Sequence, residues 1–152
     1  MLRIGLISDT HGLLRPEAVD ALRGSHHIIH AGDIGNAGIL QALSEIAPVT
    51  AVRGNNDIGD WAKALPERQQ LQFGEVALYV IHDVKELDIS PEAEGISVVI
   101  AGHSHKPSIA ERGTVFYINP GSAGPRRFKL PIAVAELLID GATLTPQIVH
   151  LE

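Results

Sequence analysis

The sequence contains no cysteine among its 152 residues. This absence excludes disulfide bonds, iron–sulfur clusters, zinc sites built from thiolates and cysteine nucleophiles. It is also consistent with a reducing compartment, where structural disulfides are rare. We therefore predict a cytoplasmic protein whose chemistry depends on oxygen and nitrogen ligands.

Long hydrophobic runs and clusters of basic residues are also missing. No stretch approaches the length of a membrane-spanning helix, and the apolar run before Asp9 is shorter than that of a signal peptide. We therefore expect no membrane partner. The formal net charge is −6, so a long nucleic acid is not an expected partner. A short nucleotide or one phosphate group can still bind where a metal supplies positive charge.

Eight short apolar runs, rich in β-branched residues, predict β-strands. They span residues 2–8, 26–32, 48–54, 76–81, 96–102, 114–120, 131–139 and 142–151. Helices are predicted over 15–24, with Pro16 in the first turn, and over 36–46, with Asn36 as N-cap. The first half thus alternates strand and helix, which favours parallel pairing, whereas the second half is typical of antiparallel hairpins. We predict one mixed α/β domain spanning residues 1–152.

Polar side chains follow five of these apolar runs. They are Asp9 and His11 after the first, Asp33 after the second, Asn55 after the third, His82 after the fourth, and His103 and His105 after the fifth. Ligands of open α/β sheets bind beyond the carboxyl ends of the strands, so we expect these residues to meet at one rim. An extended segment also points residues two apart to one side, as for His103 and His105. A polar turn after the strand would explain this pair equally well if it stood alone.

The seven residues offer carboxylate, amide and imidazole ligands and no sulfur, a set that suits manganese, iron, nickel or zinc better than calcium. Seven ligands would crowd one ion, whereas two ions that share Asp33 would each receive four. A consistent division gives one ion Asp9, His11, Asp33 and His105, and the other ion Asp33, Asn55, His82 and His103. Two divalent ions and two carboxylates leave a charge of +2, which attracts a phosphate. Two-metal sites generate hydroxide near neutral pH and stabilise in-line phosphoryl displacement.

The order and spacing of these motifs resemble the calcineurin-like metallophosphoesterase superfamily. The resemblance rests on D-T-H-G, H-A-G-D, R-G-N-N-D, I-H-D, G-H-S-H and N-P-G-S, and it extends from Asp9 to Arg127. The short chain and the segment INPGSAGPRR are most similar to the YfcE/MJ0936-type phosphodiesterases, a branch that includes the retromer subunit Vps29. The resemblance implies a four-layer α/β/β/α sandwich of two mixed sheets flanked by helices, which is the metallo-dependent phosphatase fold.

The resemblance also implies an activity. It predicts a metal-dependent phosphodiesterase, a hydrolase that cleaves phosphate diesters with a hydroxide held by a dinuclear centre of the seven ligands above. The expected ions are manganese, with nickel, iron or zinc as alternatives, and the expected substrate is a small phosphodiester or nucleotide-like molecule. Relatives are often homodimers or homotetramers. A protein-binding scaffold like Vps29 and a nucleotide or phosphoprotein monoesterase stay open, although the complete ligand set favours an enzyme over the scaffold.

Two positions depart from the pattern of the family. Asn56 stands where many members have a histidine that helps to protonate the leaving group. Without this acid, we expect aryl or nucleotide-like diesters, which have good leaving groups, to react faster than alkyl monoesters. The segment IHDV replaces H-G-H, and Asp83 and Val84 there leave the wall of the pocket and the choice of substrate open.

Several nearby polar residues have two interpretations each. His30 either supports a metal ligand or packs within its strand. Asp57 either holds the neighbouring turn or a histidine ring, or it is an ordinary turn residue. Asn119 is predicted to organise its loop and not to bind metal. Arg126 and Arg127 either bind a substrate phosphate or lie in solvent.

Overall fold

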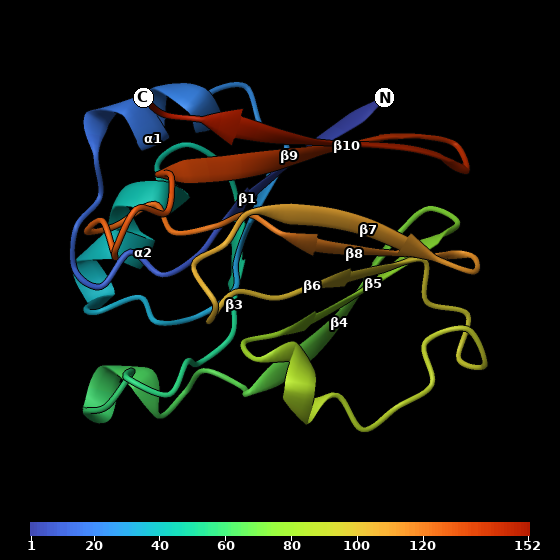
Figure 1. Ribbon diagram of the computed structural model, residues 1–152, viewed down its shortest axis with the longest axis horizontal. Coiled ribbons are helices and arrows are strands. Elements are labelled where there is room, and N and C mark those ends of the chain that lie inside the picture. Colours follow the sequence, from blue (N-terminus) through green and yellow to red (C-terminus); the bar gives the residue numbers. More distant parts are fainter.

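The computed structural model describes all 152 residues and contains two five-stranded mixed sheets (Figure 1). In spatial order, the first sheet consists of β10 (Thr143–His150), β9 (Ala133–Asp140), β1 (Leu2–Ile7), β2 (His27–His30) and β3 (Val49–Ala51). The second consists of β4 (Arg68–Phe73), β5 (Val76–Ile81), β6 (Val98–Ile100), β8 (Val115–Asn119) and β7 (Ser108–Arg112).

The pairing of the strands agrees with the sequence in the first sheet and differs in the second. β1, β2 and β3 are parallel, and β9 and β10 form the predicted antiparallel hairpin. In the second sheet, however, the predicted strands β5, β6 and β8 pair in parallel, so the prediction of hairpins between them is wrong. The reason is the connection 82–97, which returns over the outer face of the sheet before β6 begins. Antiparallel hairpins do occur there, but they join β5 to β4 and β8 to β7. The edge strands β4 and β7 were not predicted.

Two α-helices, α1 (Pro16–Leu22) and α2 (Ala37–Ser44), cover the first sheet. Pro16 begins α1, and the Asn36 side chain caps α2 by accepting a hydrogen bond from the Ile39 backbone N–H at 3.3 Å. Both ends therefore agree with the sequence signals. The other helical segments are the 3-10 turns η1 (Asp60–Ala62) and η2 (Val84–Glu86). No helix has the length and hydrophobicity needed to cross a lipid bilayer.

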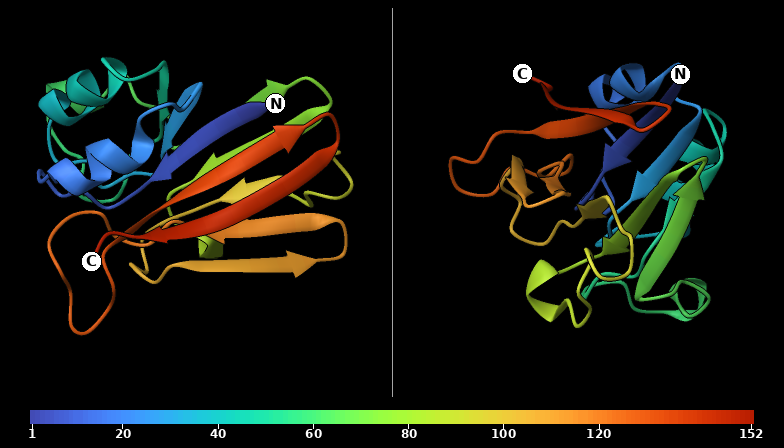
Figure 2. Two further views of the ribbon diagram at one scale, coloured as in Figure 1. Left: turned by 90° about the horizontal axis from the view of Figure 1, so that it is seen from above. Right: turned by 90° about the vertical axis from the view of Figure 1, so that its right-hand side faces the viewer.

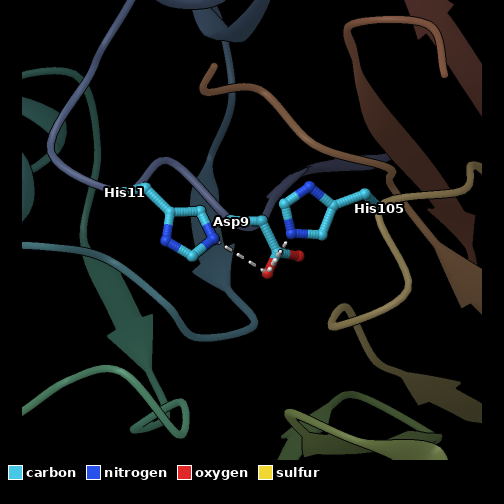
Figure 3. A group of neighbouring side chains, drawn as sticks. All are labelled: Asp9, His11 and His105. Carbon is cyan, nitrogen blue, oxygen red and sulfur yellow. Dashed lines mark ion pairs between the residues drawn. The ribbon is translucent and has the colours of Figure 1, made fainter. Parts of the chain in front are cut away.

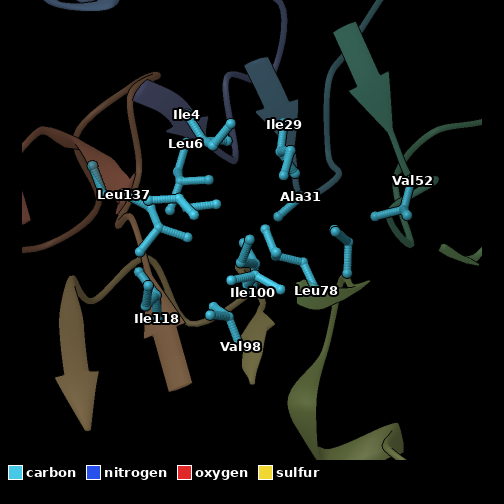
Figure 4. Close-up of a cluster of buried hydrophobic side chains, with 14 residues drawn as sticks. Ile4, Leu6, Ile29, Ala31, Val52, Leu78, Val98, Ile100, Ile118 and Leu137 are labelled. Carbon is cyan, nitrogen blue, oxygen red and sulfur yellow. The ribbon is translucent and has the colours of Figure 1, made fainter. Parts of the chain in front are cut away.

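Three buried apolar clusters separate the layers of the molecule. The largest has 14 residues and lies between the two sheets, where Leu6, Ile29, Leu78 and Ile100 meet (Figure 4). A second cluster joins the first sheet to α1 and α2, which lie together on its outer side (Figure 2). The third lies on the outer face of the second sheet, where Leu87 from the connection 82–97 packs against it. The fold is therefore the predicted sandwich, but its outer layer over the second sheet holds η2 and a loop in place of an α-helix.

Candidate metal centre

All seven predicted ligands come from loops that follow β1, β2, β3, β5 and β6. Six of them form two groups, and within each group one ligand atom per residue lies within 4.8 Å of the others. The groups are Asp9, His11 and His105 (Figure 3), and Asp33, His82 and His103. Asn55 lies with His82 and His103 on the wall of a cavity of about 180 Å³. The structure thus brings together residues that are up to 96 positions apart in the chain.

Asp9 is fully buried and uses its two carboxylate oxygens differently. Oδ2 accepts hydrogen bonds from Ser8 Oγ at 2.7 Å and from the His103 backbone N–H at 3.0 Å. Oδ1 has no hydrogen-bond partner and lies 3.7 Å from His11 Nε2 and 3.5 Å from His105 Nε2. Burial raises the pKa of Asp9, but the ionic contact with His11 and the hydrogen bond from Ser8 outweigh this effect, and the pKa falls below its usual range. The same contact raises the pKa of His11.

Asp33 lies between the two groups. Its Oδ1 accepts a hydrogen bond from the Asn56 backbone N–H at 2.9 Å, and its Oδ2 accepts one from Asn56 Nδ2 at 3.1 Å. Oδ2 also lies 3.3 Å from His82 Nε2 and 3.7 Å from His11 Nε2, one histidine from each group. Burial raises the pKa of Asp33, but the contacts with His82 and Asn56 lower it well below its usual range. Asp33 thus contacts one histidine of each group.

His82 is held in one tautomer. Its Nδ1 lies 2.7 Å from the carbonyl oxygen of Ala31, which can only accept, so Nδ1 carries the proton. In the neutral ring Nε2 therefore carries the lone pair, which faces Asp33 at 3.3 Å and Asp9 at 4.0 Å. Burial lowers the pKa of His82, but the contacts with Asp33 and the Ala31 carbonyl outweigh this effect and raise it. A side chain at Gly32 would prevent this arrangement, since a Cβ there would lie 2.6 Å from His82 Nδ1. Fixing of the second ring nitrogen in this way is typical of histidines that bind metals.

The backbone at the site is strained. Positive φ angles between 46° and 69° occur at five predicted ligands, which are Asp9, His11, Asp33, His103 and His105. Residues with a Cβ rarely adopt this conformation, which persists only where the surrounding structure enforces it. One such restraint is the backbone hydrogen bond of 2.9 Å from His11 N–H to the Asp33 carbonyl, which ties the first two loops together. The loops are therefore fixed in shapes that aim these side chains inward.

Asp57 ties the loop after β2 to the loop after β3. Its Oδ1 accepts hydrogen bonds from the backbone N–H groups of Ile34 at 2.8 Å and Gly35 at 3.0 Å. Its Oδ2 accepts one from the Gly54 N–H at 2.9 Å. The prediction that Asp57 holds its neighbouring turn is therefore confirmed, and the alternative contact with a histidine ring is absent.

His30 supports the loops and does not face the ligand groups. Its Nδ1 accepts a hydrogen bond from the Gly32 N–H at 3.1 Å, so the proton resides on Nε2, which donates to Thr10 Oγ1 at 3.0 Å. The Thr10 hydroxyl in turn donates to the Ile34 carbonyl at 2.7 Å. Because His30 is completely buried, its pKa falls to about 3 and the ring stays neutral.

Asn119 organises the loop that carries His103, as the sequence predicted. Its Nδ2 donates to the Gly102 carbonyl at 2.9 Å and to Ser104 Oγ at 3.0 Å. Its Oδ1 accepts a hydrogen bond from the Gly121 N–H at 2.9 Å, so both ends of the amide hold backbone or loop atoms. The amide therefore shapes the loop through three contacts.

The two adjacent arginines differ in their surroundings. Arg126 forms an ion pair with Glu152 and donates a hydrogen bond to the Leu130 carbonyl at 3.3 Å, so its guanidinium already has partners within the chain. Arg127 is exposed and forms no ion pair. Burial lowers the pKa of His105, the charge of Asp9 raises it, and the positive charge of Arg127 lowers it further, so that the net direction is downward.

Sequence reasoning missed Ser8 and left the role of Asn56 open. Ser8 is the last residue of an apolar run, and only its position next to Asp9 hinted at a contact with that carboxylate. Asn56 follows Asn55, and nothing in the sequence distinguishes the residue that holds Asp33 from its neighbour. Both residues fix a carboxylate while leaving lone pairs free.

The unpartnered atoms of the site fit divalent cations. Buried polar atoms without any hydrogen-bond partner include Asp9 Oδ1, His11 Nε2 and His82 Nε2, and all three face one another. Unpaired buried acceptors are costly by about 1–3 kcal/mol each, and a cation removes this cost. Within the two groups, the nitrogen–oxygen separations of 3.3–3.7 Å also suit ligands of one ion, since two ligands about 2.1 Å from a tetrahedral ion lie about 3.4 Å apart.

Comparison with known proteins agrees with this geometry. The profile of the calcineurin-like phosphoesterase superfamily domain matches residues 2–141. A probable metallophosphoesterase of Methanothermobacter thermautotrophicus is 36% identical over 97% of this chain and 91% of its own length. The phosphodiesterase YfcE of Escherichia coli is 28% identical over 80% of this chain and 79% of its own. The crystal structure of Chaetomium thermophilum Vps29 superimposes with a TM-score of 0.85 at 20% identity, covering 99% of this chain and 89% of that one. The chain therefore belongs to the calcineurin-like phosphoesterase superfamily.

Proposed function

We propose that this chain is a metal-dependent phosphodiesterase that holds two divalent ions, most readily manganese. One ion is assigned to Asp9, His11, Asp33 and His105, and the other to Asp33, Asn55, His82 and His103. The observation that carries the proposal is the position of Asp33 Oδ2, 3.3 Å from a histidine of one group and 3.7 Å from a histidine of the other. The name of the relative YfcE, a phosphodiesterase, supports the class of reaction.

Different residues of the chain would have different roles in this reaction. When bound, two such ions supply a nucleophile near neutral pH and neutralise charge that develops on a phosphoryl group. Asn56 holds the Asp33 carboxylate with two hydrogen bonds, and it has no proton to give to a leaving group. Arg127 is exposed and forms no ion pair, so its guanidinium is free to donate to a non-bridging phosphate oxygen. The site therefore favours diesters whose leaving group needs no protonation, such as nitrophenyl esters.

Metal binding and turnover test this proposal together. Protein freed of metal by a chelator is titrated with manganese in a calorimeter, and hydrolysis of bis(4-nitrophenyl) phosphate is followed with and without the ion. We expect two ions per chain and turnover that requires them, and Asp33→Asn is expected to lower manganese affinity by at least about 100-fold. Asp20→Asn on α1 is the matched control, because Asp20 is exposed, pairs with Arg23 and belongs to neither ligand group.

Unfolding by urea in chelator shows whether Asp33→Asn is folded. We expect this variant to fold but to be less stable than the metal-free wild type, because the contacts with His82 and Asn56 stabilise the charged form of Asp33 in the folded state. Absence of manganese binding in the wild type, or turnover that persists in excess chelator, refutes the proposal. Equal metal affinities of Asp33→Asn and Asp20→Asn refute the shared ligand.

A protein-binding scaffold is the second candidate, and the likeness to Vps29 favours it. The two candidates differ in one outcome of the same experiment. A chain that binds two manganese ions but hydrolyses neither aryl diesters nor aryl monoesters is a scaffold that keeps a metal site. If 4-nitrophenyl phosphate is hydrolysed faster than the diester, the protein is a monoesterase instead.

A further inference from the structure

A groove of about 370 Å³ begins at His103 and extends over the outer face of the second sheet. Its floor includes Val99 of β6 and Tyr117 of β8, whose side chains point away from the core between the sheets. The residues around η2 form one wall and β7 forms the other, and Figure 1 shows these two elements on either side of β6. The groove is accessible because no α-helix covers this face of the sheet.

The groove opens into the proposed metal centre. Asp83 and His103 line both this groove and the cavity of about 180 Å³ that contains Asn55 and His82. Asp83 Oδ2 lies 3.7 Å from His103 Nε2, and its Oδ1 accepts a hydrogen bond from the Lys85 N–H at 3.1 Å. A phosphodiester whose phosphorus lies at the metal centre can therefore place one of its two ester groups in the groove.

Two cations line the groove. The side chains of Ser108, Ala110 and Arg112 alternate onto one face of β7, where Ala110 pairs with Tyr117. The Arg112 guanidinium lies over the Tyr117 ring, 4.8 Å from its centroid. Lys85 projects from η2 on the opposite wall.

Neither cation of the groove is neutralised. Neither Arg112 nor Lys85 forms an ion pair, although the whole chain carries a net charge of −6. The only carboxylate that lines the groove is Asp83, which is directed to His103. The walls of the groove therefore present two positive charges that nothing in the fold neutralises.

We propose that this groove binds one ester group of the phosphodiester substrate and selects a group that carries a second anion, such as a nucleoside 3′-phosphate. The apolar floor contacts the body of the ester group, and its planar ring stacks near the Tyr117–Arg112 pair. Arg112 and Lys85 donate charge-assisted hydrogen bonds to the second anion. This inference rests on the proposed function, because it assumes that the phosphorus of a diester lies at the ligand groups.

Two substrates that release the same phenol test the selection. Thymidine 5′-(4-nitrophenyl phosphate) and its 3′-phosphorylated form differ only in the second anion, so their leaving groups are identical. With manganese present, we expect the 3′-phosphorylated form to have a kcat/KM at least about 10-fold higher. A factor of this size corresponds to the free energy of about one charge-assisted hydrogen bond. Arg112→Met is expected to bring the ratio near one, and Arg112→Lys to retain part of it. Arg23→Met, which removes a positive charge on the far side of the molecule, leaves the ratio unchanged.

Binding without metal separates this inference from the proposed function. Chelator-treated protein is titrated with thymidine 3′,5′-bisphosphate and with thymidine 5′-phosphate, and the ratio of the two Kd values is measured. We expect the bisphosphate to bind at least about 5-fold tighter to the wild type but not to Arg112→Met. Equal affinities in the wild type, or a preference that Arg112→Met retains, overturn the groove inference. If no diester is hydrolysed, the proposed function fails, while the Kd ratio still decides whether the groove binds an anion.

Discussion

Acidification from pH 7 to pH 5 is predicted to destabilise the protein through His30. This imidazole is completely buried and neutral, and burial lowers its pKa from 6.5 to about 3. In the unfolded chain the same group takes up a proton below about pH 6.5. Between pH 6.5 and pH 3 the unfolded state therefore binds more protons than the folded state, and stability falls as the pH falls.

The expected effect is about 2 kcal/mol. With pKa values of 6.5 unfolded and about 3 folded, the linkage relation gives a loss of about 0.2 kcal/mol at pH 7 and about 2 kcal/mol at pH 5. Urea unfolding of the wild type and of His30→Gln at both pH values, in chelator, measures this loss. Glutamine retains an N–H that can reach Thr10 but does not titrate. The difference in stability between the two proteins is expected to shift by about 2 kcal/mol in favour of the variant.

The comparison cancels contributions from the other histidines, since both proteins contain them. His150→Gln, on the exposed edge strand β10, is the matched control and is expected to follow the wild type. Parallel pH dependences of the wild type and His30→Gln would refute the assignment of a neutral buried imidazole. A steeper loss in His30→Gln than in the wild type would refute the sign.

Two further substitutions test how the site is supported. Asn56→Ala removes the amide that donates to Asp33 Oδ2 at 3.1 Å; a roughly 10-fold weaker manganese affinity in calorimetry is expected, and an unchanged affinity would contradict this role. Gly32→Ala places a Cβ 2.6 Å from His82 Nδ1 at a φ of +104°, so urea unfolding is expected to show a loss of about 3 kcal/mol. Gly74→Ala also has positive φ but meets no atom within 4 Å, and a loss of only about 1 kcal/mol is expected; equal losses would show that the contact with His82 is unimportant.

The pattern of apolar runs predicted every strand except the two at the edges of the second sheet. β4 and β7 lie at the edges of the second sheet, and their sequences RQQLQF and SIAER contain few apolar residues. Such strands form because a buried neighbouring strand has free backbone N–H and C=O groups with which they can pair. The sequence of the edge strand itself gives no sign of this neighbour. The direction of β6 was mistaken for the same kind of reason, because it depends on the course of residues 82–97 outside the sheet.

The candidate site was easier to predict than its supports. Each predicted ligand follows an apolar run, so the sheet topology alone brings the ligands to one rim. The supports depend on individual hydrogen bonds between loops, such as those that Asp57 accepts from Ile34 and Gly35. The sequence left the role of Asp57 between two interpretations, and only the hydrogen bonds of the folded loops decide between them.

The left-handed backbone at five of the proposed ligands sets a limit on how robust this protein can become. Each such residue costs about 1 kcal/mol or more compared with glycine at the same position. Glycine there would relax the loop but would delete an imidazole or a carboxylate. A lineage that no longer needed the ions could therefore gain thermal resistance by replacing these residues with glycine. A lineage that needs the ions must keep the strained backbone. Selection for thermostability and selection for a complete ligand set therefore oppose each other in this fold.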